Sequence, residues 1–275
     1  MKKHFIFRNF AFCVLLCALC VRLTSCSDKD NKNNLVFESF NATYTYSWTG
    51  SAADYRHEND RIMCDSASMV LPVILDGNST AQLRDTILYR AFGQNAATAI
   101  EAFEKWSASD AKECGYETKP DTVMFNDADG FRIVQGHVVN LTVNLMTYCI
   151  VTSTYLPDAA NGYETMDYIN YYLPESRFIF LKDIFTPEGL EKLPELIAKQ
   201  AENNSRYAGE VDITSLPEND NFYLSSEGEI VFSYQPMEVG PHSLGNVQVA
   251  FLPAELVNYM TAPAVKMFGL SDLVD

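Results

Sequence analysis

The chain has 275 residues, of which 47% are hydrophobic and 20% are charged. This balance is typical of a folded globular protein and excludes a disordered or fibrous one. Thirty-six acidic residues against 20 basic ones give a net charge of −16, which argues against a nucleic-acid partner because phosphate binding needs concentrated Lys and Arg. The single long apolar run lies at the very start, so the composition also disfavours an integral membrane protein.

The N-terminus has the pattern of a secretory signal. Three basic residues precede the apolar run Phe10–Val21, which is shorter than the roughly 20 residues that cross a bilayer. The run is followed by Leu23-Thr24-Ser25-Cys26, which resembles a bacterial lipobox, where a peptidase cuts before the cysteine and lipid is attached to its thiol. We therefore expect residues 1–25 to be a lipoprotein signal peptide and Cys26 to be the lipidation site.

The polar residues after Cys26 predict where the protein resides. Residues 26–35 are expected to be the lipidated cysteine and a tether, which would hold the protein on a membrane without crossing it. The Ser-Asp-Lys-Asp run that begins at Ser27 resembles the signal that sends Bacteroidetes lipoproteins to the outer face of the outer membrane. We expect an outer-membrane lipoprotein at the cell surface, with the periplasmic face as the alternative.

Processing changes the charge and the cysteine count. Without residues 1–25 the chain keeps 16 basic and 36 acidic residues, a net charge of −20. Three further cysteines remain, Cys64, Cys114 and Cys149, without CxxC spacing. This leaves room for one disulfide in an oxidising compartment, although buried free thiols are favoured.

The mature part alternates between strand and helix patterns. Period-two alternation through Phe40, Ala42 and Tyr44 predicts a half-buried strand. In chain order, the patterns first predict strands at 36–48 and 61–75, then helices at 79–92 and from 96 to 105 or beyond. Strands follow within 131–155, with a break at Gly136, and at 163–173 and 177–181. The chain continues with a helix from 186 that Pro194 must kink or restart, strands at 222–224, 229–234 and 247–251, and a last helix at 253–260.

This order predicts an α+β fold with antiparallel sheets and helices packed on them, either as one body or as two intimately packed subdomains.

Residues 177–260 resemble a known family. The pattern comprises a strand and the step Asp183-Ile184-Phe185, a helix, a strand at Asn221–Leu224, the loop Glu238–Gly245, and a final strand and helix. It is similar to the extracytoplasmic domain shared by the anti-sigma factor RsiV and the non-catalytic part of the peptidoglycan deacetylase PdaC. The resemblance implies an RsiV-like part at 177–275, after an N-terminal α+β part at 36–176 that resembles the family only weakly.

The chain departs from that family at two places. A Gly-Gly-Ala-His turn is replaced by Asp158-Ala-Ala-Asn-Gly162, so its histidine is missing, and Met237 stands where an aromatic residue is common. The catalytic deacetylase domain, with its aspartate pair and histidine ligands, is not recognisable in the sequence.

The rest of the chain lacks the spacing of a catalytic or metal motif. His57, His137 and His242 are far apart and never at i, i+4 spacing, so no zinc triad is predicted. Residues 126–130 resemble the start of a calcium loop, but Phe125 occupies the place of its first aspartate, and a turn is the favoured interpretation. We expect no metal, no cofactor and no catalytic residue.

The loop Tyr234–Gly245 contains the candidate binding residues. Its prolines and glycines stiffen an irregular path, and Tyr234, Glu238 and His242 carry its polar groups. The alternative is a structural loop in which the glutamate caps backbone donors. A second candidate surface is the run of tyrosines at positions 163, 168, 171 and 172, which could stack on sugars, although cross-strand packing is the favoured interpretation.

These observations favour a non-enzymatic cell-envelope lipoprotein. Its partner would be a cell-wall or host-derived molecule, either a lysozyme-like cationic protein or peptidoglycan, and a charge of −20 would speed encounter with a cation at low salt. The alternatives are an enzyme that acts on peptidoglycan or glycans through carboxylates and a structural envelope lipoprotein. Two acids that converge in a cleft would favour the enzyme.

Overall fold

The computed structural model describes residues 34–48, 61–76, 78–113, 117–119, 128–157 and 159–273, all of which belong to one compact unit, Asn33–Asp275. The expected signal peptide, Cys26 and most of the tether lie outside the described residues, as do His57, Cys114 and Asp158. Within the described ranges, no helix is both long and apolar enough to cross a membrane.

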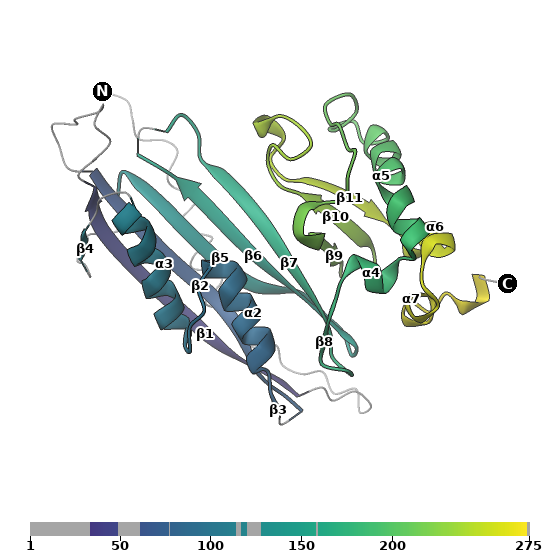
Figure 1. Cartoon of the computed structure of the whole chain (residues 1–275), viewed down its shortest axis with the longest axis horizontal. Helices are drawn as coiled ribbons and strands as arrows, with labels where there is room; N and C mark the ends of the chain where they lie inside the picture. Colours follow the sequence, from purple (N-terminus) through teal and green to yellow (C-terminus); the bar gives the residue numbers. More distant parts are fainter. Residues whose placement is uncertain are drawn as a thin grey trace. The chain divides into compact units, whose positions relative to one another are not determined.

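A large sheet forms the first half of the fold (Figure 1). Among the described residues it has eight strands in the order β4-β1-β2-β5-β6-β7-β8, with β3 pairing with β2. Their bounds are β1 Leu35–Trp48, β2 Arg61–Leu75, β3 Asn78–Ser79, β4 Glu117–Lys119, β5 Gly130–Leu141, β6 Leu145–Tyr155, β7 Tyr163–Tyr172 and β8 Arg177–Ile179. All neighbours are antiparallel except β2 and β5, which run parallel. The sheet is therefore mixed, which strand patterns alone did not predict.

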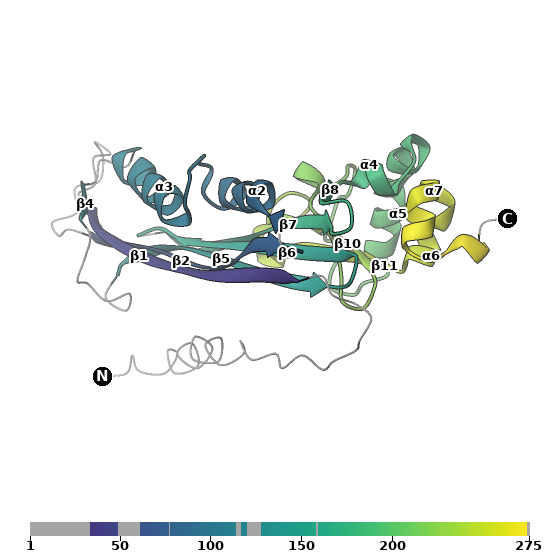
Figure 2. The same ribbon diagram turned by 90° about the horizontal axis from the view of Figure 1, so that it is seen from below.

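Two helices, α2 Ala81–Phe92 and α3 Ala99–Glu113, lie between β2 and β5 in the chain and cover one face of the sheet (Figure 2). A parallel pair needs such a crossover, so the helices account for the one parallel neighbour. The apolar stripe of α2, Leu83, Ile87 and Ala91, is buried as its spacing predicts. Gly93 ends α2 in the left-handed region, at φ 65°, where glycine carries no Cβ penalty.

The expected break at Gly136 is wrong. The strand β5 continues through this residue, which pairs with Met69 on one side and Ile150 on the other. A methyl group at Gly136 would collide with the hydroxyl of Tyr148 and the terminal methyl of Met69. The glycine therefore provides space for a buried tyrosine, and the chain turns later, at residues 142–144.

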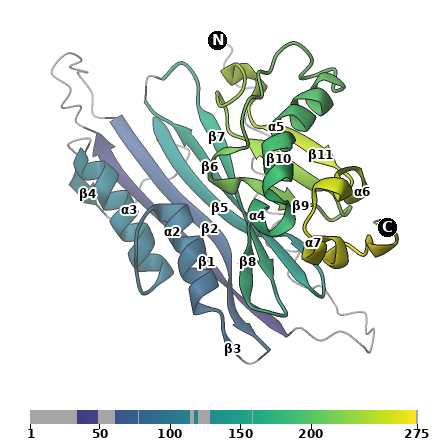
Figure 3. The same cartoon turned by 45° about the vertical axis from the view of Figure 1, so that its right-hand side comes forward.

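The second half of the fold is built around a small sheet with the order β11-β10-β9 (Figure 3). Its elements are α4 Leu181–Ile184, α5 Pro187–Glu202, β9 Phe222–Leu224, β10 Ile230–Tyr234, β11 Val247–Phe251, α6 Pro253–Leu256 and α7 Ala262–Met267. Thr186 caps α5 by accepting a hydrogen bond from Gly189 N at 3.0 Å. The helix α5 does not restart at Pro194, because the buried Leu193 and Ile197 hold both sides of the proline in the same apolar core.

Polar side chains join β9 to the face of the large sheet that the helices leave open. Asn170 donates to Phe222 O at 2.8 Å and accepts from Leu224 N at 3.3 Å. Thr147 and Asn140 both donate to Leu224 O, at 3.2 and 3.1 Å. The outer edge of β9 is thus paired with side chains instead of a fourth strand, and the predicted α+β fold is confirmed as a mixed sheet with helices and a second small sheet.

Candidate functional site

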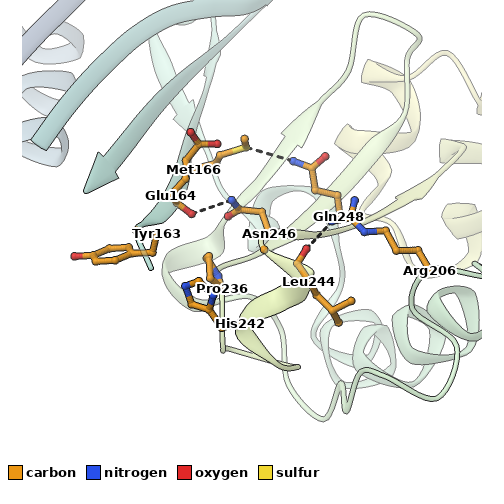
Figure 4. A pocket seen from close by; sticks show the side chains of 11 residues that line it. Tyr163, Glu164, Met166, Arg206, Pro236, His242, Leu244, Asn246 and Gln248 are labelled. Carbon is orange, nitrogen blue, oxygen red and sulfur yellow. Dashed lines mark hydrogen bonds between the residues drawn. The ribbon is translucent and has the colours of Figure 1, made fainter. Parts of the chain in front are cut away.

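A recess of about 400 Å³ lies beside the start of β7 (Figure 4). Its walls come from three separate stretches of the chain: the start of β7, the segment between β10 and β11, and the loop after α5. The lining residues are Gly162, Tyr163, Glu164, Met166, Arg206, Pro236, His242, Leu244, Gly245, Asn246 and Gln248.

Side-chain amides close the edge of β7 next to this recess. Gln235 accepts from Met166 N at 3.1 Å and donates to Met166 O at 2.6 Å. Asn246 donates to Glu164 O at 3.0 Å (Figure 4), and Asn221 accepts from Tyr168 N at 3.0 Å. An open edge would present unpaired backbone groups, so these amides replace a neighbouring strand and fix the wall of the recess.

Several groups of the recess are suited to recognition. Tyr163 is 50% exposed. Arg206 is fixed by one hydrogen bond, from Nη2 to Leu244 O at 2.6 Å, and supplies a positive charge. The Oδ1 atom of Asn246 is buried and has no hydrogen-bond partner among the described residues.

Of the three predicted binding residues, His242 lines the recess. Tyr234 is fully buried, and its hydroxyl donates to Ser215 O at 2.9 Å; burial raises the pKa of this hydroxyl above its usual value. Glu238 accepts from Glu218 N at 2.8 Å and from Gln235 N at 2.7 Å. Tyr234 and Glu238 therefore hold the loop that presents His242, and direct ligand binding by these three residues stays a prediction.

The tyrosine run separates into packed rings and one exposed ring. Tyr168 stacks on Tyr223 at 4.3 Å between centroids, and Tyr171 meets Phe178 edge to face at 5.3 Å. Tyr163 alone of the run borders the recess. Sequence motifs did not predict Arg206 and Asn246, because both residues lie far from Tyr163 in the chain. The signal that could have identified Arg206 is its position as a single basic residue among acidic ones.

The cysteines and the acids form no second centre within the described ranges. Cys64 and Cys149 are buried free thiols, as favoured from the sequence. No group of three or more His, Cys, Asp or Glu side chains that could hold a metal ion occurs in the part of the chain that the structure describes.

Comparison with known proteins supplies a family for part of the chain. Residues 182–251, from α4 to β11, match the family described as "Protein of unknown function (DUF3298)". This segment is similar to DUF3298 domains. No curated protein matches the chain.

Two solved structures share the fold around this matched segment. A DUF3298 family member from Bacteroides fragilis NCTC 9343 superimposes with a TM-score of 0.65 at 18% identity, over 88% of this chain and 99% of that one. A DUF3298 family protein from Pseudomonas aeruginosa PAO1 gives a TM-score of 0.51 at 12% identity, over 84% of this chain and 96% of that one. At these identities the likeness concerns the fold, which in both cases extends well beyond the DUF3298 segment.

Proposed function

We propose that the chain is a non-enzymatic lipoprotein of the cell envelope whose recess binds a cell-wall glycan. The observation that carries this proposal is the lining of the recess, where an exposed ring and a cation come together. A volume of about 400 Å³ lies in the range of roughly 300–1,000 Å³ found for small-ligand sites. In this proposal residues 177–275 are the RsiV-like part and 36–176 support it.

The recess suits a peptidoglycan fragment in particular. The face of Tyr163 can stack on a sugar ring, and the guanidinium of Arg206 can pair with a carboxylate of the glycan or its peptide. Each of these groups recognises a ligand without reacting with it.

The anchoring part of the proposal rests on the sequence of the N-terminus. The lipobox-like Leu23–Cys26 would place lipid on Cys26 and hold the protein at the outer membrane, at the cell surface or on the periplasmic face. Incorporation of labelled palmitate into the chain, and its loss in Cys26→Ser, tests this part. Labelling that persists in the variant would contradict it.

A lysozyme-like cationic protein is a second candidate partner, favoured by a separate observation. Residues 200–251 contain eight acidic residues and one basic residue, Arg206. This stretch includes the loop after α5 and all three strands of the small sheet. Complementary charge speeds the encounter with a cationic partner and loses its effect as salt rises.

Pull-down of the chain from residue 27 with peptidoglycan fragments and, separately, with lysozyme tests both candidates. We expect saturable binding of the fragments at low and at physiological salt, because stacking and hydrogen bonds are screened little. Lysozyme binding that vanishes at physiological salt would mean that the acidic charge serves solubility and does not recognise this partner.

Two variants assign the glycan to the recess. Tyr163→Ala removes an exposed ring and should weaken fragment binding by about tenfold, equivalent to about 1.4 kcal/mol. The matched control is Tyr89→Ala, because Tyr89 is 52% exposed on α2 and does not line the recess. Equal binding of the fragments by both variants would show that the recess is not the glycan site.

A further inference from the structure

A second cavity lies further along β7, with walls that the proposed glycan site does not use. It has a volume of about 220 Å³. Thr86 and Arg90 of α2 form one wall and Tyr168 of β7 forms another. The remaining wall includes Phe178, Phe180 and Asp220. The cavity therefore combines a cation, an anion and two aromatic rings in a small space.

Arg90 is held in place but keeps part of its hydrogen-bonding capacity. Its Nη1 atom donates to Asp167 Oδ1 at 2.9 Å and to Tyr168 O at 3.0 Å. A guanidinium has five N–H donors in a fixed plane, and the described residues supply no partner to Nε or Nη2 of Arg90. The anchored side chain thus offers donors that a carboxylate can accept.

Asp220 lies in a turn whose backbone is unusual. Asn219 and Asp220 are consecutive non-glycine residues in the left-handed region, at φ 58° and 54°. Within the described ranges, the carboxylate of Asp220 has no hydrogen bond or ion pair. Strained backbone gathers at ligand sites when the surrounding structure holds it, and here it accompanies a carboxylate that borders a cavity.

The apolar walls limit the size of a ligand. Phe178 and Phe180 are half-buried, and their ring centroids are 6.4 Å apart. The cavity is smaller than the roughly 300–1,000 Å³ of sites for drug-sized ligands. It therefore suits a small molecule with one apolar branch.

We propose that this cavity binds a zwitterionic α-amino acid with a small apolar side chain. Its carboxylate would accept hydrogen bonds from Arg90, its ammonium group would pair with Asp220, and its side chain would contact Phe178 and Phe180. The ammonium group of the ligand matches the Asp220 carboxylate, and its carboxylate would share the Arg90 guanidinium with Asp167, whose ion pair is made through Nη1. This site is independent of the glycan site, because the two cavities share no lining residue.

Calorimetric titration of the full chain with L-alanine, L-valine and L-leucine tests the site. We expect saturable binding of at least one of them. Two analogues of leucine dissect the contacts: 4-methylpentanoate lacks the ammonium group and 3-methylbutan-1-amine lacks the carboxylate. Each analogue should bind at least about tenfold more weakly than leucine, because each leaves one charged wall without a partner.

A matched pair of variants assigns the ammonium contact. Asp220→Asn removes the charge but keeps a residue that adopts the left-handed region readily, so the turn should remain. This variant should weaken binding of the amino acid at least about tenfold. Asp212→Asn removes an exposed carboxylate of the same loop that does not line the cavity, and should leave binding unchanged. Thermal unfolding of both variants checks the fold.

Three results would overturn the proposal. One is the lack of binding by all three amino acids up to their solubility limits. Another is an analogue that binds as tightly as leucine, which would show that the charged group it lacks is not recognised. The third is unchanged binding in folded Asp220→Asn. None of these results bears on the glycan proposal, since the Tyr163→Ala experiment reports on a different cavity.

Discussion

At the scale of single residues, carboxamide side chains serve as substitutes for missing strands. Asn170 faces the edge of β9, and Gln235, Asn221 and Asn246 face the edge of β7. A carboxamide has both a donor and an acceptor, so it can satisfy an edge as a neighbouring strand would. These side chains both close the edges and join the two sheets.

Removing Asn170 should therefore destabilise the whole chain. In Asn170→Ala, Phe222 O and Leu224 N lose their partner in a buried environment, and an unsatisfied buried group costs about 1–3 kcal/mol. We expect a loss of about 2–4 kcal/mol in the free energy of unfolding, measured by urea denaturation. Asn41→Ala, at an exposed site where the side chain accepts one hydrogen bond from Ser68, is the control. A loss no larger than that of the control would refute the role of Asn170.

Gly136 gives a second prediction at this scale. Gly136→Ala should destabilise the fold by about 1–3 kcal/mol, because the added methyl group overpacks the space taken by the Tyr148 hydroxyl. Tyr148→Phe removes that hydroxyl, so the double variant should recover part of the loss. Thermal or urea unfolding of the two single variants and the double variant checks this, and purely additive losses would indicate that the Tyr148 hydroxyl is not the obstacle.

At the scale of elements, the sequence predicted those whose pattern is local. The alternation of β1, the buried stripe of α2 and the Thr186-Pro187 start of α5 all appear as expected. The parallel pairing of β2 with β5 was not predicted, because it depends on where the α2–α3 crossover returns the chain. The recess was missed for a similar reason, since Tyr163, Arg206 and Asn246 share no local pattern.

The position of α3 depends on a buried ion pair that no periodicity indicates. Arg132 Nε donates to Asp65 Oδ1 at 2.8 Å, and Ser107 of α3 donates to Asp65 Oδ2 at 2.7 Å. The guanidinium lies 4.2 Å from the centroid of the Trp106 ring, also on α3. One carboxylate thus connects β2, β5 and the helix.

Breaking this pair on one side should cost more than replacing it entirely. Arg132→Met leaves the fully buried Asp65 without its counterion, and we expect a loss of about 3–5 kcal/mol. The double variant Asp65→Leu with Arg132→Met should be closer to the parent in urea unfolding. Lys192→Ala, which breaks the exposed pair with Glu195, should cost less than about 0.5 kcal/mol. A double variant worse than Arg132→Met would contradict the argument.

At the scale of the whole molecule, two apolar cores lie on either side of polar connections. One core fills the space between the large sheet and α2–α3, and the other surrounds the small sheet and α5. Hydrogen bonds from Asn140, Thr147 and Asn170 cross between them. Each candidate cavity also takes walls from both halves, so ligand binding should stabilise the connection between the halves.

The two buried thiols of the large sheet report on the opening of the molecule. Burial raises the pKa of Cys64 from 9.0 to about 11 and that of Cys149 from 9.0 to about 12. Only the thiolate reacts with a disulfide reagent, so both thiols of the folded chain should be inert near pH 8 and should react fully in urea. Because the folded state favours the neutral thiols, their contribution to stability is complete below about pH 9 and is lost as the pH rises towards 11 and 12.

The measurement uses the chain from residue 27 with Cys114→Ser, where Cys64 and Cys149 are the only thiols. Reaction with a chromogenic disulfide is followed at pH 8 with and without urea. A ligand that fills either cavity should slow the residual reaction of the native chain, because it binds the closed state and leaves the open state unchanged. Fast reaction of either thiol without urea would mean that the large sheet opens locally, and the two halves would then not unfold as one body.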